Sequence, residues 1–289
     1  MKLNLRYAVV QGSMRTFLAI LLLYSSAFAQ RHIKTSEDLG GATNIRADIK
    51  LGAVNLRLGG VRNPDKAFEL NYAYQSDQKV PKLMYEVAGT DGVFRLSNDK
   101  GQTSFPLLEF DKQKDSVDLG LSTEVPVSLR MAFGVCDAMV DLGGMEISDA
   151  SFSTGVCSFD LNFSKPNKIK CDNLSVKTGI SSVTVENLSN AHAKSIEFNG
   201  GLGSIKIDFG GKIVTDCDVR VKTGLGSVDI AIPSDINTTI TTPESFLTSV
   251  NVAGFYSQGG GVYRSTDKKG PQLRIHIESA MGGVNIRSY

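Results

Sequence analysis

One phrase recurs along the second half of the chain, and its spacing constrains the fold more than any other feature. The phrase is G-x-G-S followed by alternating apolar and polar residues, as in "GLGSIKIDF" from Gly201 and "GLGSVDIAI" from Gly224. Related copies start at Gly134, Gly155, Gly179 and Phe246. The six starts are 21, 24, 22, 23 and 22 residues apart. A nearly constant step over this many copies predicts a stack of repeated structural units.

The alternation within each copy predicts the type of unit. Ile205 and Ile207 fall on one face of an extended chain, and Ser204 and Lys206 fall on the other. A period of two is typical of a strand with one buried face. A second alternating segment precedes most copies, so each repeat is expected to contain two short strands separated by a turn or kink at the glycines. Coils of about 22 residues that stack in this way form a β-solenoid.

The glycine pattern has a second interpretation, a phosphate-binding loop, which the surrounding residues disfavour. A dinucleotide-binding fingerprint requires a strand, a glycine turn and then a helix. Here another strand follows Gly224 and Gly226, and Pro233 ends it. We therefore interpret the glycines as corners of the solenoid.

The chain divides into three expected parts, and the third has two regions. Residues 1–29 form a secretory signal peptide and 30–45 a linker, and 46–289 form a single domain. Within that domain, 46–133 is irregular and contains the hairpin "LMYEVAGTDGVFRLS", and 134–289 contains the regular coils with a hairpin insertion at 253–272. The hairpin indicates an antiparallel elaboration that covers the first coils. The first copy, "KLGAVNLRL" from Lys50, is aligned with the copy at Gly134, which places Asn55 beside Met139.

The first 29 residues have the organisation of a signal peptide. Basic residues precede an apolar run from Phe17 to Tyr24, and small residues follow, so cleavage is expected between Ala29 and Gln30. Eight apolar residues are too few to cross a bilayer, which takes about 20. Translation starting at Met14 would give a more compact signal. We expect export to the periplasm, the cell surface or the medium, with no transmembrane segment after cleavage.

Charge and composition disfavour several classes of partner. Removal of the signal leaves 28 basic residues against 30 acidic ones, with no run of like charge. A nucleic-acid-binding protein would show a basic patch, so no nucleic-acid partner is expected. The chain contains no Trp and eight Tyr, so aromatic stacking of sugars has few residues to use.

Stacked coils also predict columns of side chains on the outer surface. A serine column and, two residues further on, a charged column form a candidate interaction face. Its members are Ser158, Ser182, Ser204, Ser227 and Ser249, with Asp160, Lys206 and Asp229 beside them. The simpler interpretation is a solvated surface whose side chains hydrogen-bond to one another. The alternative is a flat surface that recognises a repetitive partner.

Catalytic and metal-binding patterns are weak. Asp137, Asp141 and Asp160 could lie close together on adjacent coils, as an acid pair that cleaves a polysaccharide would require. Stacking also brings some acids together without function. His32, His192 and His276 are the only histidines, and no metal-binding or calcium-loop motif is present. We expect no cofactor and no catalytic residue.

The cysteines leave two alternatives open. Cys136 and Cys157 occupy the same column of adjacent coils, where backbones lie about 4.8 Å apart. That spacing is near the lower limit for a disulfide, so a bond and a pair of buried thiols are both compatible with the sequence. Cys171 and Cys217 are expected two coils apart, which is too far for a bond.

The repeat "GLGSVDIAIP", its companion "GLGSIKIDF" and the segment "VPVSLRMAFGVCDAMVDLGG" resemble the toastrack domains of bacterial envelope proteins. These include adhesin-type domains and the LiaF-like cell-wall-active-antibiotics response proteins. The resemblance covers about residues 46–289 and implies a right-handed single-stranded β-solenoid without catalytic residues. It further implies a scaffold or protein-interaction module linked to envelope stress or adhesion, with an envelope protein or a cell-wall glycan as partner. The alternative is an enzyme or binding module that acts on glycans through the outer face.

Overall fold

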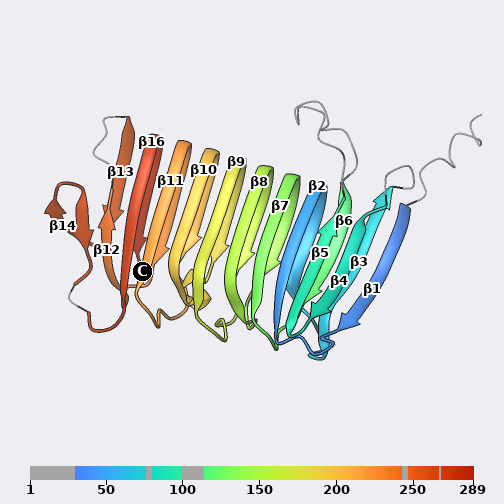
Figure 1. Ribbon diagram of the computed structural model, residues 1–289. Coiled ribbons are helices and arrows are strands. Elements are labelled where there is room, and N and C mark those ends of the chain that lie inside the picture. The colour runs from blue at the N-terminus through green and yellow to red at the C-terminus, as the bar shows by residue number, and fades with distance from the viewer. Residues whose placement is uncertain (1–29, 76–79, 99–113, 243–246, 267) are drawn as a thin grey trace, which may run out of the picture.

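The computed structural model describes residues 30–289 except 76–79, 99–113, 243–246 and 267. The expected signal peptide and the cleavage-site residue Ala29 lie outside the described residues. The described part is a single 16-stranded open sheet with one 3-10 helix, η3 (Leu188–Ala191). Figure 1 shows the strands standing side by side in an elongated row. The chain is thus all-β, as the alternation predicts.

Seven long parallel strands form the centre of the row. In spatial order they are β2 (Asn44–Gly60), β7 (Val127–Asp141), β8 (Ile147–Asn162), β9 (Cys171–Glu186), β10 (Ala193–Asp208), β11 (Cys217–Ile232) and β16 (Gln272–Ser288). Each strand is continuous through the corner where the sequence suggested a break between two shorter strands. In Figure 1 each strand bends over at its middle, so that its two halves form two layers. We call the N-terminal halves the first layer and the C-terminal halves the second layer.

The hydrophobic core fills the space between the two layers. In β10, Ile196 and Phe198 of the first layer and Ile205 and Ile207 of the second are at most 4% exposed. The register keeps like residues together: Ile205 pairs with Val183 on one side and Val228 on the other. Each coil therefore buries its apolar residues against the same column of its neighbours, which is the packing of a β-solenoid.

The bend depends on glycines whose Cα atoms lie against the backbone of the preceding coil. Gly203, Gly226 and Gly282 have φ angles of 134°, 152° and 138°, which disfavour any residue with a side chain. A Cβ added at Gly226 would lie 1.7 Å from the carbonyl oxygen of Gly203. The predicted corner role of these glycines is therefore confirmed, and the reason is both the backbone angle and the close approach.

Replacing Gly226 with alanine should destabilise the fold strongly, because the new methyl group overlaps the backbone of the neighbouring coil. We expect Gly226→Ala to lower the free energy of unfolding by about 3 kcal/mol or more. The matched control is Gly283→Ala, since Gly283 has open space around the added Cβ. Thermal melts of the two variants test this, and equal melting temperatures would show that the corner does not require glycine.

The N-terminal end is covered on both layers by strands that first pair parallel with β2 and then continue with antiparallel pairs. The second layer continues from β2 through β6 (Asp115–Leu121) and β3 (Lys66–Gln75) to β1 (Gln30–Asp38). The first layer continues through β5 (Asp91–Ser97) and β4 (Lys82–Ala88), which form the expected hairpin.

The expected linker, 30–45, is wrong in most of its length. Residues 30–38 form β1, which pairs antiparallel with β3, and β2 begins at Asn44. An edge strand needs few apolar residues, because only one side of it is paired and its surroundings are largely solvent. Within β1, Ile33 is the only aliphatic residue, so the segment lacks the alternation that identified the other strands.

The C-terminal end departs from the order of the sequence. The last strand, β16, lies between β11 and the strands that precede it in the chain, β12 (Asn237–Thr241) and β13 (Thr248–Ala253). The expected hairpin insertion is formed by β14 (Tyr256–Gly259) and β15 (Val262–Arg264). Strand β15 pairs with β12, so the hairpin extends the first layer beyond β12. The copy that starts at Phe246 is therefore not the neighbour of β11, although the two are consecutive in the sequence.

The alignment of the first repeat was wrong by two residues. Asn55 pairs with Asp137, and Arg57 pairs with Met139, whereas the sequence pattern placed Asn55 beside Met139. A shift of two residues leaves every side chain on the same face of the strand, so alternation alone cannot detect it.

A buried polar cluster joins the corner of β2 to the N-terminal strands. Tyr72 and Asn98 both donate hydrogen bonds to Oδ2 of Asp115, at 2.7 and 2.8 Å. Asn98 also accepts a hydrogen bond from the backbone N–H of Gly52 at 2.8 Å. All three side chains are at most 7% exposed, and burial raises the pKa of Tyr72, with the bond to Asp115 adding to the effect.

Removing Asn98 should be costly, because it leaves the Gly52 N–H without a partner and the Asp115 carboxylate with one donor fewer. We expect Asn98→Ala to lower the free energy of unfolding by about 3 kcal/mol. Asn55→Ala, at an exposed position of the same strand as Gly52, should change it little. Urea denaturation of both variants measures the difference, and a loss below that of the control would mean that the cluster adds no stability.

Candidate functional site

The outer surface of the second layer carries the predicted columns, and we call it the polar face. The pairings run from Ser158 to Ser182, Ser204 and Ser227 on consecutive coils. The next coil supplies Gly283 of β16, and Ser249 follows it. The serine column therefore exists, with a glycine between its last two members. The Oγ atoms of Ser182 and Ser204 lie 3.3 Å apart, within hydrogen-bond distance.

The neighbouring column carries the charged residues of the candidate interaction face. Asp160 is followed by Thr184, Lys206, Asp229, Asn285 and Asn251 on successive coils. Asn285 donates a hydrogen bond to Asp229 at 3.0 Å. Asp160 and Lys206 are exposed. The column thus presents single charges of both signs, and several of its members, Thr184, Lys206, Asp229, Asn285 and Asn251, line a shallow hollow of about 420 Å³.

Tyr289 contacts two residues of the polar face, Asp208 and Arg287. The hydroxyl of Tyr289 donates a hydrogen bond to Asp208 at 2.7 Å, and the guanidinium of Arg287 lies 5.6 Å from the centre of its ring. Burial raises the pKa of Tyr289 to about 12, and the bond to Asp208 contributes. The tyrosine therefore stays protonated and keeps this hydrogen bond at neutral pH.

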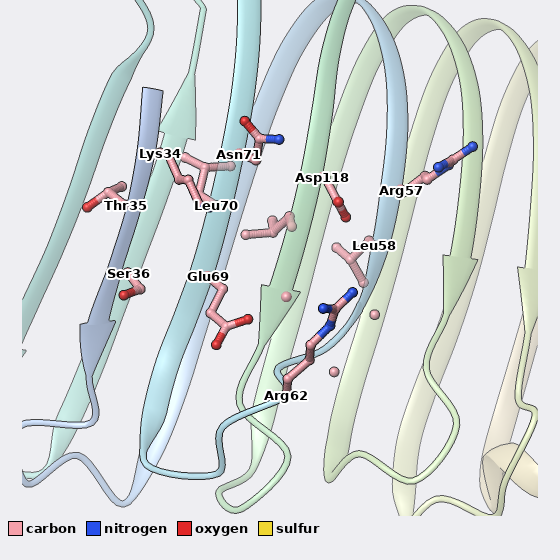
Figure 2. Close-up of a pocket in the computed structure, with 14 residues that line it drawn as sticks. Lys34, Thr35, Ser36, Arg57, Leu58, Arg62, Glu69, Leu70, Asn71 and Asp118 are labelled. Atoms are coloured by element: carbon pink, nitrogen blue, oxygen red, sulfur yellow. The ribbon is translucent and has the colours of Figure 1, made fainter. Parts of the chain in front are cut away.

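A mixed-charge trough crosses the polar face where β2 meets the N-terminal strands. It consists of two adjoining hollows of about 630 and 730 Å³, and both are lined by Arg57, Asn71 and Asp118. Asp137 and Asp160 line the smaller hollow, and the larger one contains Lys34, Arg62 and Glu69. In Figure 2, Glu69 and Arg62 lie at one end of the larger hollow, and Asn71, Asp118 and Arg57 lie across the other.

Two of the three predicted carboxylates reach the trough, and the third does not. Asp137 and Asp160 line it, but Asp141 accepts hydrogen bonds from the N–H of Gly143 at 2.9 Å and from the hydroxyl of Ser164 at 2.6 Å. Asp141 therefore shapes a loop. Asp137 forms an ion pair with Lys114. Of the three predicted carboxylates, only Asp137 and Asp160 therefore reach the trough together, where a glycosidase would need two acids.

Arg57, Asn71 and Asp118 were not predicted to form one site. The alignment that placed Asn55 beside Met139 also put Arg57 beside Asp141, two residues out of register, because Arg57 pairs with Met139. Asn71 and Asp118 lie on β3 and β6, which stack beside β2 although they belong to the irregular part of the chain. Their alternating sequences indicated strands, but nothing in the repeat predicted which strand they pair with.

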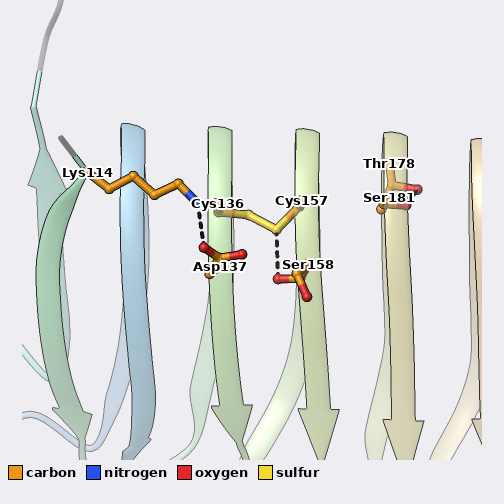
Figure 3. Close-up of a disulfide and its surroundings, with 7 residues drawn as sticks. All are labelled: Lys114, Cys136, Asp137, Cys157, Ser158, Thr178 and Ser181. Atoms are coloured by element: carbon orange, nitrogen blue, oxygen red, sulfur yellow. Dashed lines mark hydrogen bonds and ion pairs between the residues drawn. A yellow bond between two sulfur atoms is a disulfide. The ribbon is translucent and has the colours of Figure 1, made fainter. Parts of the chain in front are cut away.

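The cysteines at two adjacent corners are bonded. A disulfide joins Cys136 and Cys157, whose Cα atoms lie 4.6 Å apart, and Figure 3 shows it bridging β7 and β8 beside the Lys114–Asp137 pair. The structure thus decides between the two alternatives that the sequence left open. Cys171 and Cys217 are free and buried, as their expected separation requires, and burial raises the pKa of each thiol to about 12.

Reduction should destabilise the protein, because the bond closes a loop of 21 residues in the unfolded chain. A loop of this length corresponds to about 3 kcal/mol. We expect a reductant to lower the melting temperature of the wild type and to leave that of the double variant Cys136→Ala/Cys157→Ala unchanged. A wild-type melt that is insensitive to reductant would show that the bond is absent in solution or does not stabilise the fold.

The bend of the solenoid carries an exposed apolar rim. Ile180, Leu202, Leu225 and Met281 pair in register on four adjacent coils, and each is 44–50% exposed. The residues on either side of each are Gly, Ser or Ala. The rim follows from the bend itself, because at the corner a side chain points away from both layers.

Within the described residues, no group of three or more His, Cys, Asp or Glu is arranged to hold a metal ion. On the outer surface of the first layer, Nε2 of His276 lies 3.3 Å from Oε1 of Glu278. In the same part of the chain, no helix has the length and apolar character needed to cross a membrane.

The geometry defines a class of protein: a β-solenoid with a polar outer face and structural glycines at its corners. The family model that matches is the N-terminal domain of toast_rack, DUF2154, over residues 26–186 and again over 168–231. The chain belongs to this family. No curated protein matches the chain.

Solved structures support the fold. A "putative cell adhesion protein" from Clostridium sporogenes is 17% identical, with a TM-score of 0.53, over 90% of this chain and 100% of its own. A "putative adhesin" from Bacteroides fragilis is 12% identical, with a TM-score of 0.32, over 91% of this chain and 98% of its own. At 17% identity, the likeness to the protein from Clostridium sporogenes shows a shared fold.

Proposed function

We propose that this protein is an exported, non-enzymatic interaction module of the bacterial cell envelope, which binds an envelope protein through its polar face. The observation that carries the proposal is the mixed-charge trough at one end of that face. Its cationic groups, Lys34, Arg57 and Arg62, alternate with carboxylates across adjoining hollows. Charges of both signs on a fixed backbone favour a partner surface with complementary charges, since such patterns set orientation and specificity.

A protein partner fits this surface better than a glycan does. The most exposed aromatic residues in the described part are Tyr256 and Tyr289, at 61% and 52%, and neither lines the trough. Sugar rings are commonly bound by stacking on such residues. The acid pair required for glycan hydrolysis also lacks support, because Asp141 is committed to its loop and Asp137 to Lys114.

Several further features support the role in the envelope. The N-terminal 29 residues have the composition of a secretory signal, and the Cys136–Cys157 disulfide suits an oxidising compartment. The relative from Clostridium sporogenes carries a cell-adhesion description, and a link to adhesion or envelope stress belongs to this proposal. The polar face provides the binding surface that each of these roles needs.

Capture of partners from the native cell tests the proposal. The tagged chain is cross-linked in the envelope, and co-purifying molecules are identified. We expect one dominant protein, whose recovery falls at least about tenfold when Arg57→Glu and Arg62→Glu are combined, since this reverses two of the cationic groups of the trough. The matched control makes the same change on the first layer, as Arg130→Glu with Arg220→Glu, where both arginines are exposed.

The outcomes separate the alternatives. Equal loss of the partner in both double variants would contradict the assignment of the polar face. Recovery of cell-wall or polysaccharide fragments in place of a protein would favour the glycan alternative, and Asp137→Asn and Asp160→Asn would then be the variants to examine.

A further inference from the structure

The strand β13 has a backbone edge that no described strand covers. It pairs with β16 along Thr248–Ala253, and none of the other described strands pairs with it. An edge strand turns half of its N–H and C=O groups away from its neighbour. These groups remain available for hydrogen bonds to an added strand.

The other edges of the sheet carry features that discourage such pairing. In β1, Arg31 and Glu37 lie opposite the buried residues Tyr74 and Phe68, so both charges point to the core side of the strand. The strand β14 is four residues long and contains a bulge between Ser257 and Gly259. Inward charges, short length and bulges are the devices by which natural edge strands avoid pairing.

Strand β13 has none of these devices. Its sequence, TSVNVA, contains no charged residue and no proline, and its pairing with β16 runs without a register shift. The six residues have the composition and regularity of an interior strand. In this respect β13 differs from β1, β14 and β4 (Lys82–Ala88), which are the other described edges. Strand β4 pairs only with β5, and it carries Lys82 and Glu86 directly after Pro81, where charge and proline discourage pairing.

The core is also left open beside β13. Val250 and Val252 pair with Val284 and Ile286 of β16, which are 0% and 2% exposed, but the two β13 valines are only partly buried. Phe255 and Tyr263 also pack against this end of the core and are partly buried. An added strand with apolar residues at alternate positions would cover Val250 and Val252 as β16 covers its own neighbours.

The free edge of β13 could pair with a second copy of this chain or with an extended segment of another protein, and the shape of this end favours the second. Beyond β16 the first layer continues through β12, β15 and β14, whereas the second layer stops at β13 (Figure 1). If β13 paired with the same strand of a second copy about a two-fold axis, the two projecting hairpins would have to occupy the same space. A single extended segment fits in the step without this conflict.

We propose that the free edge of β13 binds an extended segment of a partner protein by β-strand addition. The segment has apolar residues at every second position, which pack on Val250 and Val252, and polar residues between them, which lie beside Asn251 on the outer surface. Main-chain hydrogen bonds supply affinity and the two valines supply selectivity, as in other strand-addition complexes. This surface is separate from the trough, so the inference does not rest on the proposed function.

Fluorescence anisotropy with a synthetic peptide tests the proposal. The probe is a labelled GSVDIAI peptide, which copies the strand segment 226–232, and the control peptide is GSVDPAI, which lacks one backbone donor. We expect the intact protein to bind the probe saturably and to bind the control at least about tenfold more weakly. Val252→Lys should weaken binding of the probe at least about tenfold, whereas Asn251→Lys should change it less than about threefold, because its added charge points outward.

Hydrogen exchange of the wild-type protein gives a readout that does not depend on the variants. The probe should slow exchange of the amides of residues 249–253 and leave those of β1 unchanged. Absence of binding at about 1 mM probe would overturn the proposal, as would binding without protection of β13. Equal binding by Val252→Lys and the wild type would also overturn it. A dimer in sedimentation that Val252→Lys disperses would replace the peptide with a second copy as the occupant.

Discussion

The stacking of one coil on the next at the corner glycines is the contact on which the rest of this structure depends. At Gly203, Gly226 and Gly282 the backbones approach so closely that a methyl group has no room. In β7, β8 and β9 the same position holds Cys136, Cys157 and Ser181, and the close approach is made two residues earlier. There a Cβ added at Gly134, Gly155 or Gly179 would lie 2.6–2.9 Å from the carbonyl oxygen of a glycine in the preceding coil. These approaches let the strands bend without interrupting the parallel ladder, so that their two halves enclose the core. The register of the ladder then places like residues in columns, both inside and outside.

In this arrangement, one set of residues in each strand forms the core and the alternate set forms the surface, so the two sets can vary independently. Inward residues must be apolar in every coil, whereas the alternate outward residues meet only solvent and their column neighbours. The polar face can therefore vary in charge without loss of packing, as the change from Asp160 to Lys206 within one column illustrates. The two proposed binding surfaces lie where the coils meet the irregular strands, at the trough, and where the stack ends, at β13.

The regular part of the fold was predictable from the sequence because the repeat and the alternation report directly on backbone geometry. The errors have physical causes. A two-residue slip at Asn55 preserves the face of every side chain, and β1 lies at an edge where few apolar residues are needed. Strands β13 and β16 have equivalent sequence patterns, so either could pair with β11. The order of the strands along the chain therefore did not predict that β16 lies between β11 and β13. The site was only partly predicted for the same reason, since Asn71 and Asp118 reach the trough through pairings outside the repeat.

Cysteine pairing across the inserted strand tests whether the coils stack in register with β16 between β11 and β13. Asp229 lies beside Asn285, and Asn251 lies on the far side of Asn285. Adjacent strands are about 4.8 Å apart and alternate ones about 10 Å, beyond the reach of a disulfide. Under mild oxidation we predict a disulfide in Asp229→Cys/Asn285→Cys and none in Asp229→Cys/Asn251→Cys. Bond formation in the second variant but not in the first would contradict this prediction, because the strands would then stack in the order of the sequence.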